Sequence, residues 1–451
     1  MPNPHVFREY DIRGVADRDF PDDMVRSLGL ALGTFWSRRG SRRVALGADC
    51  RVSSPRLKQA LEAGILEAGL SVLDLGMVPT PLMYFSVFHA DLDGGVQVTG
   101  SHNPPEDNGF KMMSGHATMS GSDIKALRAF IERGDLARAP GGRITAFDPL
   151  HAYVGFVKGN VSLGPKPLKV AIDAGNGAAG PTALAAFRAV GLEPTALLCE
   201  PDGAFPTHHP DPSMPENLEL LRRTVLDGGY DVGIAFDGDG DRIGVIDARG
   251  EAVFGDKLLI LLARRLLRER PGAAVLGEVK CSQTLYDDIA HKGGRPILWK
   301  TGHSLIKAKM KEEGALLAGE MSGHVFYADR FFGFDDAVYA ALRLMEILSH
   351  DPRPLDEQLA DLPPTFSTPE IRVDCPDEAK FDVVERVRER FASSREVIAV
   401  DGARILFDEG WGLVRASNTQ PVLVLRFEAS TEAALGAIRA EVEDAVEAAR
   451  A

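Results

Sequence analysis

The sequence predicts an α/β protein with three related α/β domains, whose mixed sheets are mainly parallel, followed by a C-terminal α+β domain. The first observation is a strand, turn, helix and strand unit that occurs three times, at intervals of roughly one hundred residues. Apolar strands that alternate with helices indicate βαβ units and a largely parallel sheet. The second is the length of 451 residues, which is enough for several domains.

Each unit combines a β-rich strand, a turn rich in Gly, Asp or Ser, an amphipathic helix and a second strand. In chain order, the first strands cover residues 43–49, 169–173 and 274–279, the helices cover 57–69, 181–191 and 284–293, and the second strands cover 72–75, 194–198 and 297–299. Three copies of one unit predict three domains of related architecture.

The last part of the chain has a different pattern. Strand-like runs at 366–374 and 412–427 flank a helix at 381–391, and an Ala/Glu-rich helix follows at 431–450. This order is typical of an α+β domain, and the Pro-bearing stretch 361–365 predicts a linker before it. We therefore expect domains at residues 1–148, 149–250, 251–362 and 363–451.

Composition excludes several classes of protein. Apolar residues make up 45% and charged residues 26%, as in soluble globular proteins. The net charge of -14, with basic residues interspersed among acidic ones, argues against nucleic acid or an anionic membrane as a partner. Four distant cysteines without a CxxC pair, no signal peptide and no apolar span predict a cytoplasmic protein.

Ser101 is the first candidate catalytic residue. It lies in the loop TGSHNPP (99–105), directly after the apolar strand 95–98. A serine on a Gly/Pro/Asn loop can be approached by backbone N–H groups, as a phosphoryl group requires. An ordinary turn is the alternative. A hydrolase that uses His102 as a base is a third possibility, although sequence neighbours rarely form such a pair and no GxSxG elbow is present.

Asp237, Asp239 and Asp241 form the second motif, DGDGDR, between apolar strands at 232–236 and 243–246. Three carboxylates separated by glycines can converge on one hard cation such as Mg²⁺. An EF-hand would need Gly at Arg242 and Glu at Ala248, so the calcium loop does not fit. A solvated acidic turn is the remaining alternative.

Electrostatics links these two motifs. Three carboxylates and a phosphoserine would repel one another in a partly dry site unless a divalent cation lay between them. Arg242 and Lys111 would add further balancing charge. We therefore expect the Ser101 loop and the aspartate loop to share one site.

Two glycine motifs suggest nucleotide chemistry. Residues 175–180 read GxGxxG after a strand, with Glu200 beyond, which makes an NAD-dependent oxidoreductase the main rival function. Against it, Pro181 starts the helix, and the rival leaves the Ser101 loop and the three aspartates unexplained. The run 250–255 resembles a P-loop but lacks the Lys-Ser/Thr pair that would reach phosphate.

Three further motifs are weaker. Glu320 and Ser322, two residues apart in GEMSGH, can bind neighbouring sugar hydroxyls or simply form a polar loop. Residues 415–421 (RASNTQP) combine a guanidinium with hydroxyls and an amide, which suits a phosphate-binding loop, and a plain β-turn is the alternative. His208 and His209 are interpreted as structural because no third metal ligand is near.

In this order the motifs resemble those of the α-D-phosphohexomutase superfamily, most closely the bacterial phosphomannomutase/phosphoglucomutase group. The similarity covers essentially the whole chain. It includes FREYDIRG (7–14), TGSHNPP (99–105), DGDGDR (237–242), KTGH (300–303), GEMSGH (319–324) and RASNTQP (415–421).

The resemblance implies four domains around a central cleft and a mutase that moves a phosphoryl group between the 1- and 6-oxygens of a hexose. The group would pass through phosphorylated Ser101 and a hexose 1,6-bisphosphate. One Mg²⁺ would be held by Asp237, Asp239, Asp241 and the phosphate on Ser101. The implied catalytic residues are Ser101, His102, Lys111, Arg242 and His324, with Lys111 and His324 as alternative proton-transfer groups.

The resemblance also implies a set of substrate contacts. Glu320 and Ser322 would bind the 3- and 4-hydroxyls, and residues 415 and 417–419 would bind the unreactive phosphate. The full set is Tyr10, Arg13, Lys280, Lys300, Gly302, His303, Glu320, Ser322, His324, Arg415, Ser417, Asn418 and Thr419.

Met321 within GEMSGH favours mannose and glucose phosphates, with a phosphoglucosamine mutase of the same superfamily as the alternative. Sugar phosphates are the expected partners, and a monomer is the default.

Overall fold

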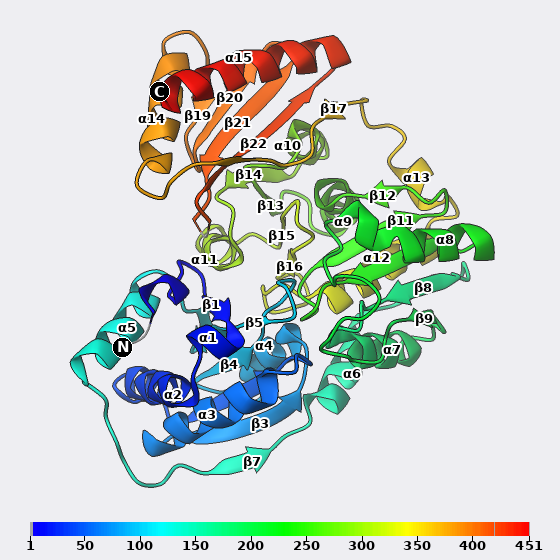
Figure 1. The fold of residues 1–451 in the computed structure, drawn as a ribbon. Coiled ribbons are helices and arrows are strands. Elements are labelled where there is room, and N and C mark those ends of the chain that lie inside the picture. Colours follow the sequence, from blue (N-terminus) through cyan, green and yellow to red (C-terminus); the bar gives the residue numbers. More distant parts are fainter. Residues whose placement is uncertain (1–2, 419, 451) are drawn as a thin grey trace.

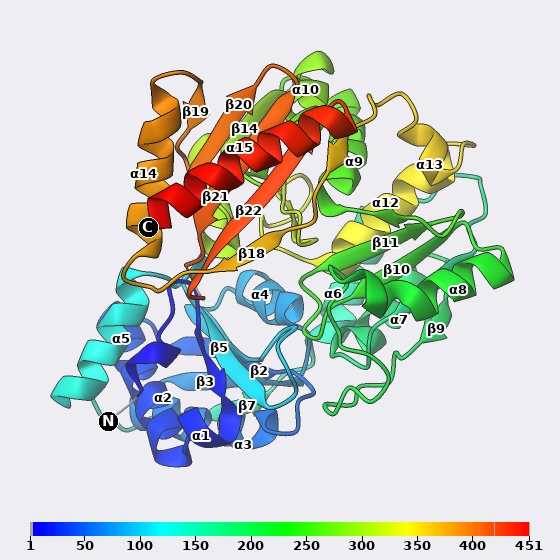
Figure 2. The ribbon, with the colours of Figure 1, turned by 45° about the horizontal axis from the view of Figure 1, so that its top comes forward.

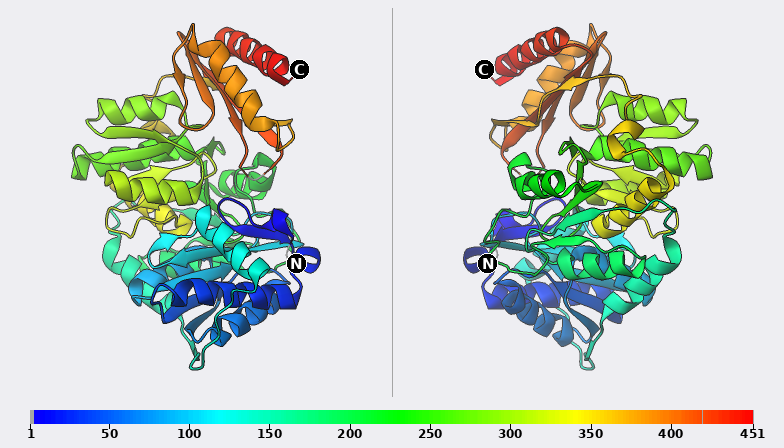
Figure 3. Two further views of the ribbon diagram at one scale, coloured as in Figure 1. Left: turned by 90° about the vertical axis from the view of Figure 1, so that its left-hand side faces the viewer. Right: turned by 90° about the vertical axis from the view of Figure 1, so that its right-hand side faces the viewer.

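The computed structural model describes residues 3–418 and 420–450, which form four β-sheets with flanking helices. In Figure 1 the N-terminal sheet (blue) lies at the bottom, the C-terminal sheet (orange and red) at the top, and the other two between them. Views from the two sides show the same order (Figure 3). This agrees with the expected fold class of three α/β units and a different C-terminal unit.

The first sheet has the strand order β1-β5-β4-β2-β3-β7, with β6 beside β5. Strand β5 runs antiparallel to β1, β4 and β6, and the remaining pairs are parallel. The strands are β1 (Ile12–Val15), β2 (Arg43–Ala48), β3 (Ser71–Met77), β4 (Gly94–Val98), β5 (Asp107–Ser114), β6 (Ala117–Thr118) and β7 (Ile144–Ala146). The helices are η1 (Pro4–Val6), α1 (Ala16–Asp19), α2 (Asp22–Ser37), α3 (Ser54–Glu67), α4 (Thr80–His89) and α5 (Ser122–Arg133).

The second sheet has the order β12-β11-β10-β8-β9 and is parallel except at β11 and β12. Its strands are β8 (Val170–Asp173), β9 (Thr195–Leu197), β10 (Val232–Phe236), β11 (Ile243–Asp247) and β12 (Ala252–Val253). Its helices are α6 (Pro149–Asn160), α7 (Ala179–Ala189), η2 (Pro215–Leu218) and α8 (Glu219–Gly228).

The third sheet has the order β14-β13-β15-β16, with only the last pair antiparallel. Its strands are β13 (Ala274–Glu278), β14 (Arg295–Trp299), β15 (Leu317–Gly319) and β16 (Val325–Tyr327). The helices of this part of the chain are α9 (Gly255–Glu269), α10 (Gln283–His291), α11 (His303–Glu313), α12 (Ala337–His350) and α13 (Leu355–Gln358).

The C-terminal sheet is antiparallel, with the order β17-β22-β21-β20-β19 and β18 also beside β22 (Figure 2). Its strands are β17 (Phe366–Ser367), β18 (Ile371–Asp374), β19 (Val397–Ile398), β20 (Ala403–Phe407), β21 (Gly410–Ala416) and β22 (Val422–Ala429). Helices α14 (Lys380–Ala392) and α15 (Glu432–Arg450) pack against it.

Two details of this last unit differ from the prediction. The expected strand 366–374 is split into β17 and β18, and the pairing with β22 shifts by one residue between them, from Ser367 opposite Glu428 to Ile371 opposite Leu425. Strands β19 and β20 were not predicted.

The hydrophobic core joins the first three sheets. Buried side chains of α4, α7, α9 and α12 belong to one cluster, in which Phe85, Phe187, Leu262 and Leu344 are fully buried. Helix α12 contacts α7, α9 and β11, so it packs between the second and third units. Among residues 3–418 and 420–450, none of the helices combines the length and hydropathy needed to cross a membrane.

Each sheet contributes one loop between antiparallel neighbours, and these loops carry four of the sequence motifs. TGSHNPP follows β4, DGDGDR joins β10 to β11, the GEMSGH turn joins β15 to β16, and the RASNTQP turn joins β21 to β22. This equivalence explains why residues far apart in sequence can meet at one place.

Candidate active site

The Ser101 loop and the aspartate loop are in direct contact. The Ser101 hydroxyl donates a hydrogen bond to Asp237 Oδ2 at 2.9 Å. Gly238 permits this approach, since a Cβ at that position would lie 2.4 Å from the Ser101 carbonyl oxygen. Ser101 itself has a positive φ of 50°, a strained conformation for a residue with a side chain. The structure thus brings together the two motifs that the electrostatic argument linked.

The three aspartates form a buried acidic cluster. One carboxylate oxygen from each of Asp237, Asp239 and Asp241 lies within 4.8 Å of the others, and all three side chains are fully buried. Oδ1 of Asp239 and Oδ1 of Asp241 have no hydrogen-bond partner within the described part of the chain. Burial, followed by the charges of Asp241 and Asp239, raises the pKa of Asp237 well above its usual value. Buried oxygens without donors suit a bound cation.

Lys111 balances part of this negative charge. Its ammonium donates to Asp239 Oδ2 at 2.7 Å and to Asp241 Oδ2. Burial opposes the charge on Lys111, but the carboxylates of Asp239 and Asp241 outweigh it and hold the lysine pKa well above the usual value. Lys111 is therefore a firmly protonated cation in this site.

His102 and Arg13 border the serine on its other side. Nδ1 of His102 lies 3.1 Å from Ser101 Oγ, so these sequence neighbours are within hydrogen-bond distance, contrary to the expectation for adjacent residues. Burial, then the charges of Arg242 and Arg13, lowers the pKa of His102 well below its usual value, which favours neutral imidazole. Arg13 Nη1 donates to Asn103 Oδ1 at 2.8 Å and thereby fixes the same loop.

Arg242 and His324 join the aspartate loop to the GEMSGH loop. Their backbones form an antiparallel bridge, and Arg242 Nε donates to His324 Nε2 at 3.1 Å. This bond makes Nε2 an acceptor and places the imidazole proton on Nδ1. Nδ1 lies 3.0 Å from Asp335 Oδ2, which places the carboxylate charge beside the ring, but the two atoms form no hydrogen bond in the described part of the chain.

The GEMSGH loop also meets the Lys300–His303 segment. Glu320 Oε1 accepts the Gly302 N–H at 2.7 Å, and Ser322 Oγ donates to Glu320 Oε2 at 3.2 Å. The His303 ring lies 6.0 Å from the His324 ring, centroid to centroid. Lys300 differs from these neighbours, because its side chain is exposed and bonds to none of the other site residues within the described ranges.

The last sheet completes the group of predicted residues. Arg415 Nε donates to Asp401 Oδ2 at 3.0 Å, and Asn418 Nδ2 donates to the Tyr10 hydroxyl at 2.6 Å. The Tyr10 hydroxyl in turn donates to the Thr301 carbonyl at 3.3 Å. The Ser417 hydroxyl accepts the Gln420 N–H at 3.2 Å. Thr419 lies outside the described residues.

Lys280 extends toward the same region. Its ammonium lies 3.1 Å from Glu370 Oε2 and 3.5 Å from Glu278 Oε1. Burial opposes its charge, but Glu278 and Glu370 outweigh that effect and raise the lysine pKa. Glu278 Oε1 also accepts the Met321 N–H at 3.2 Å, which connects Lys280 to the sugar-binding loop predicted around Glu320.

Sequence reasoning missed Arg51, which holds the serine loop from behind. Its guanidinium is fully buried and donates to the carbonyls of Ser101 (2.7 Å), Asn103 (2.6 Å), Asp107 (3.0 Å) and Pro104. Asp49 supports the same loop by accepting from the Thr99 hydroxyl at 2.7 Å. The DCR run after β2 gives no local signal of this role, because the carbonyls that Arg51 binds lie 50 to 56 positions further along the chain.

The remaining sequence motifs have structural roles. A Cβ at Gly177 in the GxGxxG turn would lie 2.8 Å from the Gly238 carbonyl oxygen, so this glycine lets the turn pack against the aspartate loop. His208 Nε2 lies 3.1 Å from Asp173 Oδ2, and His209 Nε2 bonds to the His102 carbonyl. The glycine turn and both histidines therefore support the site from outside.

Comparison with known families assigns each part of the chain. Four family models match in order, described as phosphoglucomutase/phosphomannomutase alpha/beta/alpha domains I, II and III and the C-terminal domain. They match residues 4–138, 151–250, 254–366 and 370–445.

Individual proteins agree with this assignment. The chain is 46% identical to a phosphomannomutase/phosphoglucomutase of Pseudomonas aeruginosa, over 96% of this chain and 94% of that protein. It is 44% identical to a phosphoglucomutase of Neisseria gonorrhoeae, over 98% and 96%. A crystal structure of a phosphoglucomutase/phosphomannomutase family protein from Burkholderia thailandensis superimposes with a TM-score of 0.94 at 42% identity, covering 100% of this chain and 98% of that one.

Proposed function

Because the chain belongs to the phosphoglucomutase/phosphomannomutase family, we propose that this hexose phosphate mutase works through a phosphorylated Ser101. The enzyme is an intramolecular phosphotransferase with sugar phosphates as substrates. The oxidoreductase suggested by GxGxxG is not favoured, since all four family models are those of mutases. One observation carries the proposal: Ser101 Oγ lies 2.9 Å from Asp237 Oδ2 in the acidic cluster.

The proposed transfer begins with phosphoserine. The bond between phosphorus and Ser101 Oγ breaks as a free hydroxyl oxygen of the hexose phosphate bonds to the same phosphorus. The product is a hexose 1,6-bisphosphate and an unmodified serine, whose oxygen regains a proton. After the bisphosphate turns around, Ser101 attacks the other phosphoryl group, and the proton movements reverse.

The acidic cluster fits a divalent cation, which we propose is one Mg²⁺ held by Asp237, Asp239, Asp241 and the phosphate of Ser101. When bound, Mg²⁺ would neutralise charge on the transferring phosphoryl oxygens. Lys111 and Arg242 would contribute fixed positive charge beside them.

His324 is the better supported of the two proton-transfer groups. Lys111 is held protonated by two carboxylates, so it cannot readily accept a proton from the attacking hydroxyl. His324 Nε2, which accepts the Arg242 N–H, would take the substrate proton once a bound ligand displaces that bond, with Asp335 3.0 Å from Nδ1. We therefore propose His324 as the general base, with neutral His102 as a hydrogen-bond partner of Ser101.

Substrate recognition would divide between two loops. Glu320 and Ser322, with His303 beside them, would bind the 3- and 4-hydroxyls. Arg415, Ser417 and Asn418, joined by Tyr10, Lys280 and Gly302, would bind the unreactive phosphate. None of these polar groups is proposed to contact the 2-substituent of the sugar, so we propose that mannose and glucose phosphates share the site. Glucosamine phosphate is the alternative substrate, and comparing activity on the three sugar phosphates distinguishes these possibilities.

The other expectations are kept as proposals. We propose domain boundaries at 148/149, 250/251 and 362/363, a monomeric enzyme and a cytoplasmic location. Arg13, which bonds to Asn103 in the Ser101 loop, and the exposed Lys300 are both proposed to contact substrate.

Ser101→Ala tests the central proposal. The expected result is loss of mutase activity by on the order of 10⁴-fold or more, together with loss of one phosphoryl mass increment from the intact protein. Ser394→Ala, which changes an exposed serine, is the matched control. A Ser101→Ala enzyme that remains active, or an active parent that never carries phosphate, contradicts the mechanism.

A further inference from the structure

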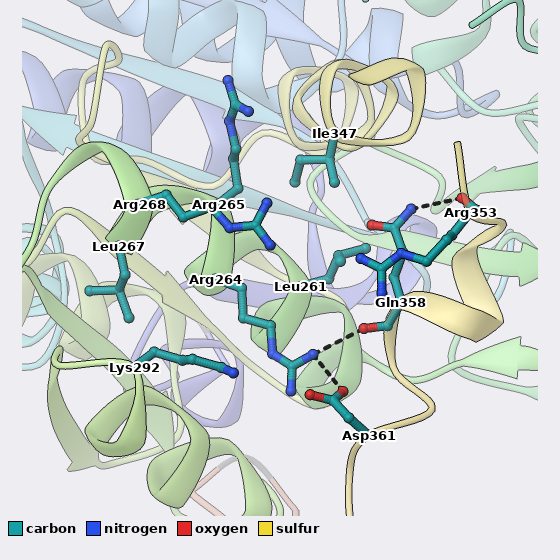
Figure 4. Close-up of a pocket in the computed structure, with 10 residues that line it drawn as sticks. All are labelled: Leu261, Arg264, Arg265, Leu267, Arg268, Lys292, Ile347, Arg353, Gln358 and Asp361. Atoms are coloured by element: carbon teal, nitrogen blue, oxygen red, sulfur yellow. Dashed lines mark hydrogen bonds and ion pairs between the residues drawn. The ribbon is translucent and has the colours of Figure 1, made fainter. Parts of the chain in front are cut away.

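A basic cavity lies outside the residues of the candidate active site. It has a volume of about 280 Å³ and is lined by parts of α9, α12 and α13, by Lys292 at the end of α10, and by Asp361 in the linker to the last sheet (Figure 4). None of its lining residues belongs to the set assigned to catalysis or substrate binding. The cavity therefore requires a separate explanation.

The sequence of α9 creates most of this basic surface. Leu261, Arg264, Arg265 and Arg268 line the cavity and follow the spacing i, i+3, i+4 and i+7. Residues at this spacing share one face of a helix. Three arginines therefore face the same space, which is unusual in a chain with a net charge of -14.

Five cationic side chains but only one carboxylate line the cavity. The cations are Arg264, Arg265, Arg268, Lys292 and Arg353, and the carboxylate is Asp361. Like charges crowded at this density repel one another unless carboxylates of the protein or a bound anion lie among them.

Ion pairs neutralise only some of these cations. Arg264 pairs with Asp288 at 2.6 Å and with Asp361 at 2.8 Å. Arg265 pairs with Glu269 at 2.6 Å, and Arg353 pairs with Asp351 at 2.7 Å.

Two cations and one buried donor remain available. Arg268 and Lys292 are exposed, and neither has a direct ion-pair or hydrogen-bond partner across residues 3–418 and 420–450, although their charges act on Asp351 and Asp361 nearby. The Nε atom of Arg265 is buried and likewise lacks an acceptor in those ranges. The cavity thus offers donors that protein acceptors do not satisfy.

We propose that this cavity binds a small, multiply charged phosphate compound. Guanidinium groups bind phosphate oxygens in a bidentate fork, and several converging cations favour a polyanion over a single carboxylate. The small volume favours a compact ligand such as a diphosphate group over a long polymer.

Binding would also connect separate elements of the fold. Arg264 already donates to the Gln358 carbonyl at 2.9 Å, which links α9 to the chain that leads to the last sheet. Arg268 lies in α9, Lys292 directly follows α10, and Arg353 precedes α13. An anion held by these three side chains would therefore connect the end of α10 to the two elements that Arg264 already joins.

Calorimetry with inorganic pyrophosphate in metal-free buffer tests the proposal. The titrated protein is the full chain carrying Arg415→Ala, which weakens anion binding at the proposed substrate-phosphate site. Pyrophosphate is expected to bind this chain with one equivalent. Adding Arg268→Ala and Lys292→Ala is expected to weaken that binding by about tenfold or more, since charge-assisted hydrogen bonds are removed.

The matched control adds Lys311→Ala and Arg386→Ala to Arg415→Ala, which removes the same charge from exposed positions elsewhere. The control is expected to bind pyrophosphate like the Arg415→Ala chain. Equal weakening in both variants would show a general charge effect and overturn the proposal. Absence of pyrophosphate binding to the Arg415→Ala chain would overturn it as well. Thermal unfolding of each variant checks that all of them are folded.

Discussion

The two ends of the candidate active site are built differently. The acidic end is formed by Ser101, Asp237, Asp239 and Asp241 in two contacting loops and by Lys111 in β5, and these side chains are almost completely buried. The basic end is formed by Tyr10, Lys280, Arg415 and Asn418. These residues come from the first, third and last units of the chain, and they meet through hydrogen bonds between those units.

The charge balance differs as well. At the acidic end, carboxylates outnumber the bonded ammonium of Lys111, and two of their oxygens lack donors within the described ranges. At the basic end, Arg415 is paired with Asp401 and Lys280 with Glu370, and a bound phosphate would replace these carboxylates as the partner of each cation. The first end is therefore organised before ligand arrives, while the second depends on how the last sheet docks.

Among the changes that compare the two ends, Asp239→Asn is expected to have the largest effect, because it removes a carboxylate from the preformed end. Activity at saturating Mg²⁺ should fall on the order of 10²- to 10³-fold through lost electrostatic stabilisation.

Removing divalent metal from the parent enzyme should also stop turnover. Full activity after exhaustive chelation would count against a metal at the acidic end.

Arg51→Ala tests whether the acidic end depends on the hydrogen bonds that Arg51 donates to the Ser101 loop. It leaves four loop carbonyls and buried Asp49 without their guanidinium partner, so unfolding free energy should drop by about 3–5 kcal/mol. The control is Arg38→Ala, an exposed ion pair whose loss should cost at most about 1 kcal/mol. Urea denaturation of both variants measures the difference, and equal losses would refute a special role for Arg51.

Arg415→Lys tests the basic end. The charge remains but the bidentate fork is lost, so KM for hexose phosphate should rise about tenfold with little change in kcat. Steady-state kinetics distinguishes this from the acidic end, where changes should lower kcat. A fall in kcat without a change in KM would mean that Arg415 takes part in the transfer itself.

The smallest effect concerns pH. Burial opposes ionisation of Glu370, but Lys280 outweighs it and lowers the glutamate pKa from 4.5 to about 2. A depressed pKa stabilises the folded state above pH 4.5, and the contribution disappears as pH falls toward 2. The loss should be on the order of 1 kcal/mol for this partly exposed pair. Glu370→Gln should remove that component from unfolding curves measured between pH 6 and 3, and an unchanged pH dependence would contradict it.

The sequence predicted the acidic end better than the basic end, for a physical reason. Ser101 and the three aspartates lie in short loops whose composition already restricts their chemistry. The roles of Arg51, Asp335 and Asp401 depend on partners supplied by distant parts of the chain, so no local pattern reveals them. Repeating strands and helices identified the three α/β units, but strands β19 and β20 lie outside any such repeat and were missed, and β19 has only two residues.

The bond between Asn418 and Tyr10 joins residues 408 positions apart. During synthesis on the ribosome, the first three units can emerge and fold while residue 418 has yet to leave the exit tunnel. The acidic end can then form on the nascent chain, whereas the phosphate-binding end is completed only after nearly all of the polypeptide has been made. Catalytic competence should therefore appear abruptly, late in translation.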